Sequence, residues 1–498
     1  MGFSLRNTFL LIPVLLLTQR ALAQQEFLFN SHCAQAYQKI IQLQLGSGQQ
    51  LLNEEKKRNP NNLVPYFLEN YIDFFTLFFN EDPEEYARRI KNKDRRLELM
   101  DKGSSASPFH LFTKSVINFQ WAAVQIKFGN HWDAGWTFRR SYLQSRENLK
   151  KFPSFTLSEL HNGAMEVAAG TIPQGYRWFS NLLGIRGNIH SGMETIRKFI
   201  DNDDAWSKLF HDEAVFYYLY LKYYVANDKQ GVMDYIRRQD LDLVNSHLFA
   251  YLASNLALNF QQSARAGQII LNRNRSSDYL QTPIWDFEYG YVRLNHLQSD
   301  AAFYLNRFVQ NFKGKFYVKD ALQKISWHYY LQGDMDKAWQ YRKMIASRGS
   351  QDTEADKLAH KESFSTVWPN KLLLQARLLN DGGYHEEALA KLLGKSASDF
   401  NLPEHKLEFS YRAARIYDDL GRKAEAIKFY THVIATGENR KEYFAARSAL
   451  QLAQLHEQRG EKNTAVKWYR KCLAMKGHDF KNSIDSRAEA GLARLISR

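Results

Sequence analysis

Two stretches near the C-terminus, GRKAEAIKFYTHVIATG (421–437) and GEKNTAVKWYRKCLAMKG (460–477), share one pattern. Each begins at a glycine and has an alanine five positions later, in the pairs Gly421/Ala426 and Gly460/Ala465. A stripe of small and apolar residues at helical spacing follows and recurs after a shift of 39 residues. The stripe is Ala426, Ile427, Tyr430, Val433 and Ile434, which return as Ala465, Val466, Tyr469, Cys472 and Leu473. The pattern predicts repeated pairs of antiparallel helices.

The same five-residue spacing continues upstream at intervals that suit such pairs. A glycine allows a tight turn between two helices. A small residue is needed where the second helix crosses the first, because a larger side chain there overpacks the crossing by about 1–3 kcal/mol. The further pairs are Gly129/Ala134, Gly187/Gly192, Gly333/Ala338 and Gly383/Ala388, with weaker ones at Leu297/Ala302 and Gln262/Gly267. We therefore expect one long array of helix pairs.

These residues resemble tetratricopeptide repeats, helix–turn–helix units with a period near 34. GAMEVAAGTIPQGYRWFSNLLGIRGNIHSGM (163–193) and FEYGYVRLNHLQSDAAFYLNRF (287–308) are also distantly similar to the inclusion-body-clearance and outer-membrane tetratricopeptide family. The resemblance implies an all-α, right-handed α-solenoid with no catalysis. The expected organisation is a signal peptide (1–23), degenerate N-terminal repeats (24–160), middle repeats (161–346), a polar insertion (347–363) and C-terminal repeats (364–498).

The glycine-rich stretch 170–193 fits the same scheme. Pro173 begins a first helix, QGYRWFSNLLG (174–184). A proline suits the first helical position because the N–H that it lacks would have no partner within the helix there. Gly187 and Gly192 then take the turn and crossing positions. The glycines do not form GxGxxG or a Walker-type loop, and no strand pattern precedes them. A phosphate-binding loop is not predicted.

The first residues read as a secretory signal. Arg6 precedes a largely apolar stretch (8–18), and Ala21–Ala23 is an A-x-A cleavage site before Gln24. We expect cleavage between Ala23 and Gln24 and, from the bacterial look of the signal, a periplasmic or outer-membrane-peripheral location. The formal charge of +14 becomes +12 without the two arginines of residues 1–23. Such a charge favours anionic partners, but the cations are mixed with acids along helical faces, as on a solvated surface.

Motifs for catalysis or metal binding are absent from the sequence. It has no H-E-x-x-H, G-x-S-x-G or C-x-x-C, so we expect no enzyme, cofactor or metal site. Cys472 lies on the apolar stripe as a core thiol, whereas Cys33 has no assigned role. Acid clusters at 80–85 and 201–204 suit helix starts. A hydrolase within 24–160 is the alternative that convergent titratable residues would support.

The densest aromatic run, VFYYLYLKYYV (215–225), is aromatic all round a helix. Packing between repeats explains one face, and Tyr217, Tyr220 and Tyr224 are candidates for lining a groove. The expected function is a scaffold that binds a protein or an extended peptide in its concave groove. The alternative is a salt-sensitive binder of an anionic envelope polymer or a lipid surface, which would make it peripheral to an envelope or membrane. No nucleic-acid partner is expected, because no recognised module is present.

Overall fold

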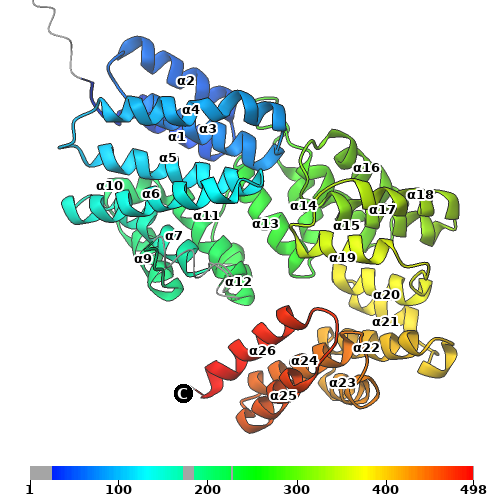
Figure 1. The fold of residues 1–498 in the computed structure, drawn as a ribbon. Coiled ribbons are helices and arrows are strands. Elements are labelled where there is room, and N and C mark those ends of the chain that lie inside the picture. The colour runs from blue at the N-terminus through cyan, green and yellow to red at the C-terminus, as the bar shows by residue number, and fades with distance from the viewer. Residues whose placement is uncertain (1–24, 172–183, 226–227, 497–498) are drawn as a thin grey trace, which may run out of the picture.

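The computed structural model describes residues 25–171, 184–225 and 228–496, and this part of the chain is helical throughout apart from its loops. It contains one isolated bridge, between Glu26 and Asn62, and no other strand pairing. Figure 1 shows the helices following one another in a curved row from one end of the chain to the other. Consecutive helices pack in pairs and each pair packs on the next. The expected all-α solenoid is confirmed.

The helices fall into three stretches, which we call the N-terminal arm, the middle and the C-terminal arm. The N-terminal arm consists of α1 (Ser31–Ile41), α2 (Leu45–Arg58), α3 (Val64–Asn80), α4 (Pro83–Asp101), α5 (Pro108–Lys127), α6 (His131–Lys151), α7 (Leu157–Gly170), α9 (Ile189–Asp201), α10 (Ala205–Leu209), α11 (His211–Tyr224) and α12 (Lys229–Arg238). The middle consists of α13 (His247–Asn259), α14 (Ser263–Asn272), α15 (Ile284–Asn295), α16 (Ala301–Asn311), α17 (Val318–Gln332), α18 (Met335–Ser347) and α19 (Glu354–Ser363). The C-terminal arm consists of α20 (Lys371–Gly382), α21 (His385–Leu392), a 3-10 turn (Ala397–Asp399), α22 (Pro403–Asp419), α23 (Lys423–Gly437), α24 (Phe444–Gln458), α25 (Lys462–Ala474) and α26 (Lys481–Ile496).

Within the described residues, eight of the helix pairs are joined by one and the same turn. In the pair α22–α23, Gly421 donates its N–H to the carbonyl of Asp418 at 3.0 Å, and Arg422 donates to Tyr417 at 2.8 Å. Gly421 itself has a left-handed φ of +76°. This is the Schellman arrangement, which satisfies the last carbonyls of the first helix. The same two bonds and a left-handed φ recur at Leu43, Gly129, Gln261, Leu297, Gly333, Gly383 and Gly460.

The turn corrects one register of the predicted repeat. The sequence pattern pairs Gln262 with Gly267, but the residue with left-handed φ is Gln261, and the buried residue five positions later is Ala266. The unit therefore lies one residue earlier than predicted. With no glycine to mark the turn, two adjacent small residues left the register open from sequence alone.

The small residues occupy helix crossings. Ala426 and Ala465 are fully buried, and Ala134, Ala338 and Ala388 are buried as well. At Gly192, a Cβ would lie 2.6 Å from the carbonyl oxygen of Gly163, so α9 crosses α7 at backbone contact. Gly187 departs from the predicted turn: its φ is not left-handed, and a Cβ there would meet the carbonyl of Glu166 at 2.2 Å. It is a close-packing glycine before α9.

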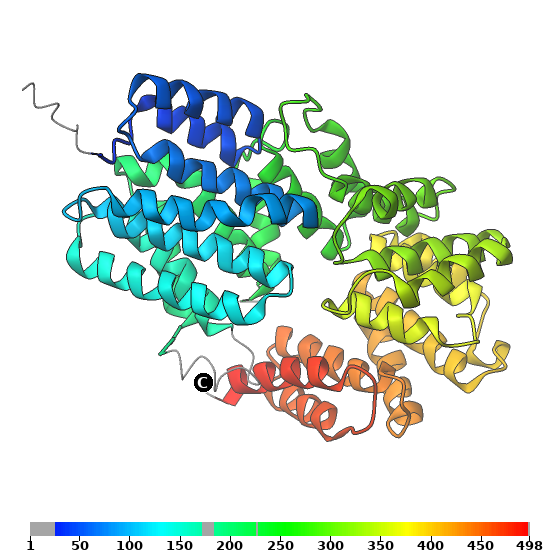
Figure 2. The ribbon, with the colours of Figure 1, turned by 45° about the horizontal axis from the view of Figure 1, so that its top comes forward.

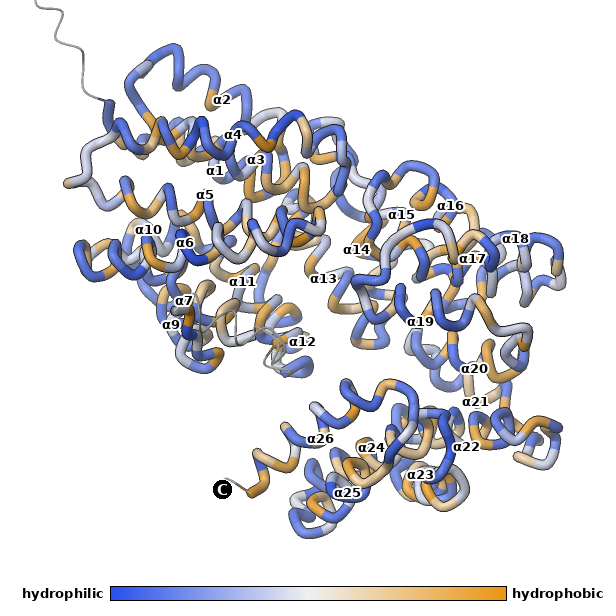
Figure 3. Tube along the Cα trace, viewed as in Figure 1, coloured by the Kyte–Doolittle hydropathy of each residue, from blue (hydrophilic) through white to orange (hydrophobic). Residues whose placement is uncertain are grey.

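Apolar packing runs along the array in successive clusters instead of one central core. Figure 3 shows hydrophobic and hydrophilic segments alternating along the helices, as helices that bury one face require. Within the C-terminal arm, Tyr430 donates to Asp418 at 3.1 Å and the repeat-equivalent Tyr469 donates to Glu457 at 2.5 Å. Each unit is stabilised mainly by its neighbours.

The polar stretch 347–363 belongs to the packed array. Most of it forms α19, where Ala359 is fully buried. The buried carboxylate of Asp356 accepts hydrogen bonds from the backbone N–H groups of Tyr317, at 2.7 Å, and of Asp320, at 3.1 Å. This carboxylate holds the start of α17 in place.

Candidate interaction surface

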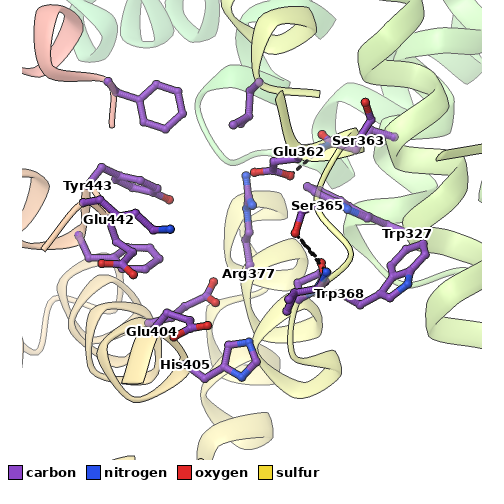
Figure 4. Close-up of a pocket in the computed structure, with 18 of the residues that line it drawn as sticks. Trp327, Glu362, Ser363, Ser365, Trp368, Arg377, Glu404, His405, Glu442 and Tyr443 are labelled. Atoms are coloured by element: carbon purple, nitrogen blue, oxygen red, sulfur yellow. Dashed lines mark hydrogen bonds between the residues drawn. The ribbon is translucent and has the colours of Figure 1, made fainter. Parts of the chain in front are cut away.

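The C-terminal half of the molecule contains a cavity of about 570 Å³. Figure 4 shows side chains converging on it from α17, from the linker between α19 and α20, from α20 and α22, and from the start of α24. Aromatic side chains line it together with charged groups of both signs. Its lining includes Trp327, Trp368, Tyr443, Phe480, Arg342, Arg377, Arg412, Glu362, Glu404 and His405.

Trp368 and the linker that carries it are held by an arginine. Arg342 donates to the carbonyl oxygens of Glu362, at 2.8 Å, and Val367, at 3.3 Å. Its guanidinium lies 4.4 Å from the centroid of the Trp368 ring, which also stacks on Tyr330 at 4.6 Å. Burial lowers the pKa of Arg342 from its usual range, and Glu362 opposes this change. The linker is thereby positioned as one wall of the cavity.

The opposite wall is built around arginines on α20 and α22. Arg412 is buried and donates to Glu408 at 2.8 and 3.1 Å. Arg377 lies 5.1 Å from the ring centroid of Trp327 and 3.6 Å from Asp381. Guanidinium groups that stack on aromatic rings keep their hydrogen-bond donors available at the ring edge. The cavity therefore offers flat apolar faces next to charged donors and acceptors.

The three tyrosines proposed for a groove divide between two environments. Tyr220 and Tyr224 are 40% and 43% exposed, and their ring centroids lie 4.9 Å apart. Tyr224 donates to Asn255 at 2.6 Å. Tyr217 is instead half-buried and is hydrogen-bonded to Glu213, whose carboxyl is buried in the N-terminal arm. Of the three, only Tyr220 and Tyr224 expose their side chains to solvent. The helix is aromatic on all sides, so packing decides which side is covered.

Tyr220 and Tyr224 lie on α11 of the N-terminal arm, and the hydrogen bond from Tyr224 to Asn255 joins them to α13 of the middle. Burial raises the pKa of both, and Tyr220 and Tyr317 each add to the rise at Tyr224. Tyr317, just before α17, is 40% exposed, and burial raises its pKa to about 12. On α15, Glu288 accepts from Ser254 and Asn255, and burial raises its pKa to about 7.

The cavity residues were not singled out by the sequence. Trp327 and Trp368 lie in unrelated stretches, and Arg412 occupies an unremarkable position of a repeat helix. Nothing in local spacing brings residues 323–369 together with 404–444. A local signal existed only for the repeats themselves.

The remaining sequence predictions concern the signal peptide, the helix expected over 174–184, metal sites and the two cysteines. The predicted signal, with its cleavage residues Ala23 and Gln24, lies outside the described residues. So do Pro173 and nearly all of the helix predicted over 174–184. In the part that is described, no helix is long and apolar enough to span a bilayer, and no group of His, Cys, Asp and Glu has the form of a metal site. Cys33 and Cys472 are both buried and free, and burial raises the pKa of each thiol to about 12.

Comparison with known proteins identifies the C-terminal repeats. Residues 407–435 and 446–479 match the model of the tetratricopeptide repeat family. They contain nearly all of α22 to α25. No curated protein matches the chain.

Two solved structures are similar to the chain at low identity. The TPR domain of P58(IPK) is 13% identical, with 83% of this chain and 98% of that chain covered at a TM-score of 0.22. Yeast Tom70 is 10% identical, with 85% and 97% covered at a TM-score of 0.24. At these scores neither structure bears on how this chain works.

Proposed function

We propose that the protein is an exported scaffold that binds an extended segment of a partner protein in the cavity of its C-terminal half. The observation that carries the proposal is the cavity itself: about 570 Å³, open to solvent, and lined by tryptophans beside arginines and glutamates. Tetratricopeptide repeats, which residues 407–435 and 446–479 match, are typical of protein–protein interaction. Binding requires no chemical step.

The lining suits a polypeptide because it combines two kinds of contact. Trp327, Trp368 and Tyr443 offer apolar area with a polar edge, as interface hot spots do. Arg377 and Glu404 offer charges of opposite sign within the same cavity. An extended chain presents side chains at regular intervals and can satisfy both kinds in turn.

Export remains part of the proposal on the strength of residues 1–23. N-terminal sequencing of the protein recovered from its native host tests it, with Gln24 as the expected first residue. A mature chain that begins at Met1 would contradict export.

Peptide selection tests the cavity directly. Random peptides displayed on phage are panned against the full chain, and selected peptides are measured by fluorescence anisotropy. Arg377→Ala and Tyr443→Ala, both in the cavity, are expected to weaken binding by about tenfold or more, as loss of an interface anchor does. The matched control is Trp136→Ala on α6, whose side chain is 48% exposed and outside the cavity. Equal binding by all three variants would rule out the cavity as the site.

A further inference from the structure

The outer side of α6 carries large apolar side chains that are open to solvent. Trp132, Trp136 and Leu143 are 64%, 48% and 44% exposed. Their spacings of four and seven residues place them on one side of the helix. Ile126, 51% exposed, lies at the end of α5, just before the turn into α6. Figures 1 and 2 both show α5 and α6 side by side on the outside of the N-terminal arm. Exposed apolar side chains that share one face of a helix indicate an interaction surface.

Basic side chains continue this row. Arg140, Arg146 and Lys150 are exposed and lie four, three and seven residues beyond Trp136 or Leu143, on the same side of α6. At the 1.5 Å rise of a helix, the row runs for about 27 Å. We call the whole row the outer stripe: Trp132, Trp136, Arg140, Leu143, Arg146 and Lys150.

The outer stripe lies on a helix with an excess of positive charge. Among the described residues, none of its three cations forms an ion pair, and Arg146 instead donates to the hydroxyl of Tyr142 at 2.9 Å. The residues outside the description contain no Asp or Glu that could pair with them. In all, α6 has five cations and two acids, Asp133 and Glu147, and the neighbouring α5 has no acid. An anionic partner would complement this charge.

The composition and position of the outer stripe fit a lipid surface. Tryptophan and leucine beside arginine and lysine on one face of a helix is the combination with which helices bind anionic membrane surfaces. Tryptophan prefers the boundary between water and lipid, because its ring is largely apolar and its N–H is polar. Neighbouring cations are attracted to the negative surface of such a membrane. The outer stripe lies on the outside of the array, where an extended surface can reach it.

We propose that the outer stripe binds the surface of an anionic lipid membrane. Its apolar side chains enter the headgroup region, and its three cations contact lipid phosphates. This inference goes beyond the proposed scaffold function and does not depend on the cavity, which lies in the other half of the molecule. Attachment through α6 holds the scaffold at a membrane and leaves the cavity open to a partner.

Vesicle flotation tests the outer stripe. The expected mature chain, from Gln24 onward, keeps every described residue and omits the apolar stretch 8–18, which would itself bind lipid. It should bind vesicles that contain phosphatidylglycerol and not vesicles of phosphatidylcholine alone, and high salt should weaken the binding.

Two variants separate the apolar and the charged contributions. They are Trp136→Ala/Leu143→Ala and Arg140→Gln/Arg146→Gln/Lys150→Gln. Each should weaken binding to the phosphatidylglycerol vesicles by about tenfold or more, because either change removes contacts that the membrane surface makes with the stripe.

Each variant has a matched control. Leu271→Ala/Phe303→Ala removes apolar side chains that are 47% and 57% exposed on α14 and α16. Lys391→Gln/Lys428→Gln/Lys467→Gln removes three exposed cations on α21, α23 and α25. Both controls should bind vesicles as the parent chain does, and circular dichroism melts verify that all four variants fold.

Three results would each overturn the lipid surface: no vesicle binding by the parent chain, equal binding to both kinds of vesicle, or equal losses in variants and controls. A dimer seen by analytical ultracentrifugation and dissociated by Trp136→Ala/Leu143→Ala, without vesicle binding, would assign the outer stripe to a second copy of the chain instead.

The phage-selected peptides keep this inference separate from the scaffold function. Both outer-stripe variants should retain their affinity for those peptides, and Arg377→Ala, in the cavity, should retain vesicle binding. Failure of vesicle binding therefore leaves the scaffold function standing, and failure of peptide binding leaves the lipid surface standing.

Discussion

The C-terminal arm and the middle build the same hairpin geometry from different sequences. The hairpins compared are α22–α23 and α24–α25 in the C-terminal arm, and α13–α14 and α15–α16 in the middle. In the C-terminal arm the turn residues are Gly421 and Gly460, and in the middle they are Gln261 and Leu297, with the same two hydrogen bonds. The family model matches only the C-terminal pairs. Hairpin geometry thus depends on the turn bonds and on a small residue at the crossing, and glycine is one way of meeting the first requirement.

Tertiary contacts hold the two non-glycine turns. A left-handed backbone costs a residue with a side chain roughly 1–2 kcal/mol. Gln261 donates through its amide to the carbonyl of Asn380, at 3.0 Å, and to Asp419, at 3.0 Å, and so ties the middle to the C-terminal arm. Leu297 is partly buried against an apolar cluster that includes Leu378. Packing between neighbouring units offsets a local cost that glycine avoids.

The largest expected difference between the two regions is their response to pH. Glu288, on α15, has a pKa raised from 4.5 to about 7 by burial. A raised folded pKa means that its stabilising contribution is fully present below pH 4.5 and is lost as pH rises through about 7. Glu288→Gln should abolish that loss, roughly 3 kcal/mol in the free energy of unfolding. Urea unfolding of both proteins below pH 4.5 and above pH 7 measures it.

Hydrogen exchange locates this effect. The loss at higher pH should fall on α13 to α15 and leave α22 to α25 unchanged, because repeat arrays transmit stability mainly to neighbours. Parallel pH profiles for Glu288→Gln and the parent protein would show that this carboxyl does not titrate in the window.

Overpacking the crossings tests whether the two regions share them. Ala426→Leu in the C-terminal arm and Ala266→Leu in the middle each replace a fully buried alanine. Each should lower the free energy of unfolding by about 1–3 kcal/mol and lower the melting temperature. Ala424→Leu, on the same helix as Ala426 but exposed, is the control and should have little effect. An unchanged melt for Ala426→Leu would mean that the crossing is assigned to the wrong residue.

Placing a leucine in a glycine turn should cost less. Gly421 has a φ of +76°, and a Cβ there meets none of the described atoms within 4 Å, so only the backbone opposes Gly421→Leu. We expect a loss of about 1–2 kcal/mol. Thermal unfolding followed by circular dichroism measures it. A loss above that range would point to a clash that the turn geometry does not contain.

The reverse exchange should have the smallest effect. Leu297→Gly relieves the left-handed backbone at φ +56° but removes a partly buried side chain. The two terms oppose each other, and the net change should stay within about 1 kcal/mol. Urea unfolding decides the sign. A large loss would show that the leucine is retained for its packing alone.

Much of the array could be predicted because its rules are local. One short stretch of chain contains the turn residue, the small residue five positions later and the apolar stripe at helical spacing. Residues such as Gly460 and Ala465 therefore predict a hairpin. The same rules placed one turn at Gln262, one residue after the true turn residue Gln261. They also assigned Gly187 to a turn, because small residues are found at close helix contacts as well as in turns. The cavity gave no such signal, because Trp327, Trp368 and Arg412 meet only after several units have stacked.

The sequence by itself determined the kind of unit this protein repeats, because short-range steric rules act within each hairpin. The tertiary structure alone decided what the array can bind. It turned Tyr217 toward Glu213 and left Tyr220 and Tyr224 open, although all three lie on one helix. Small rotations between successive units add up along a solenoid, and that accumulated curvature has no counterpart in the spacing of neighbouring residues.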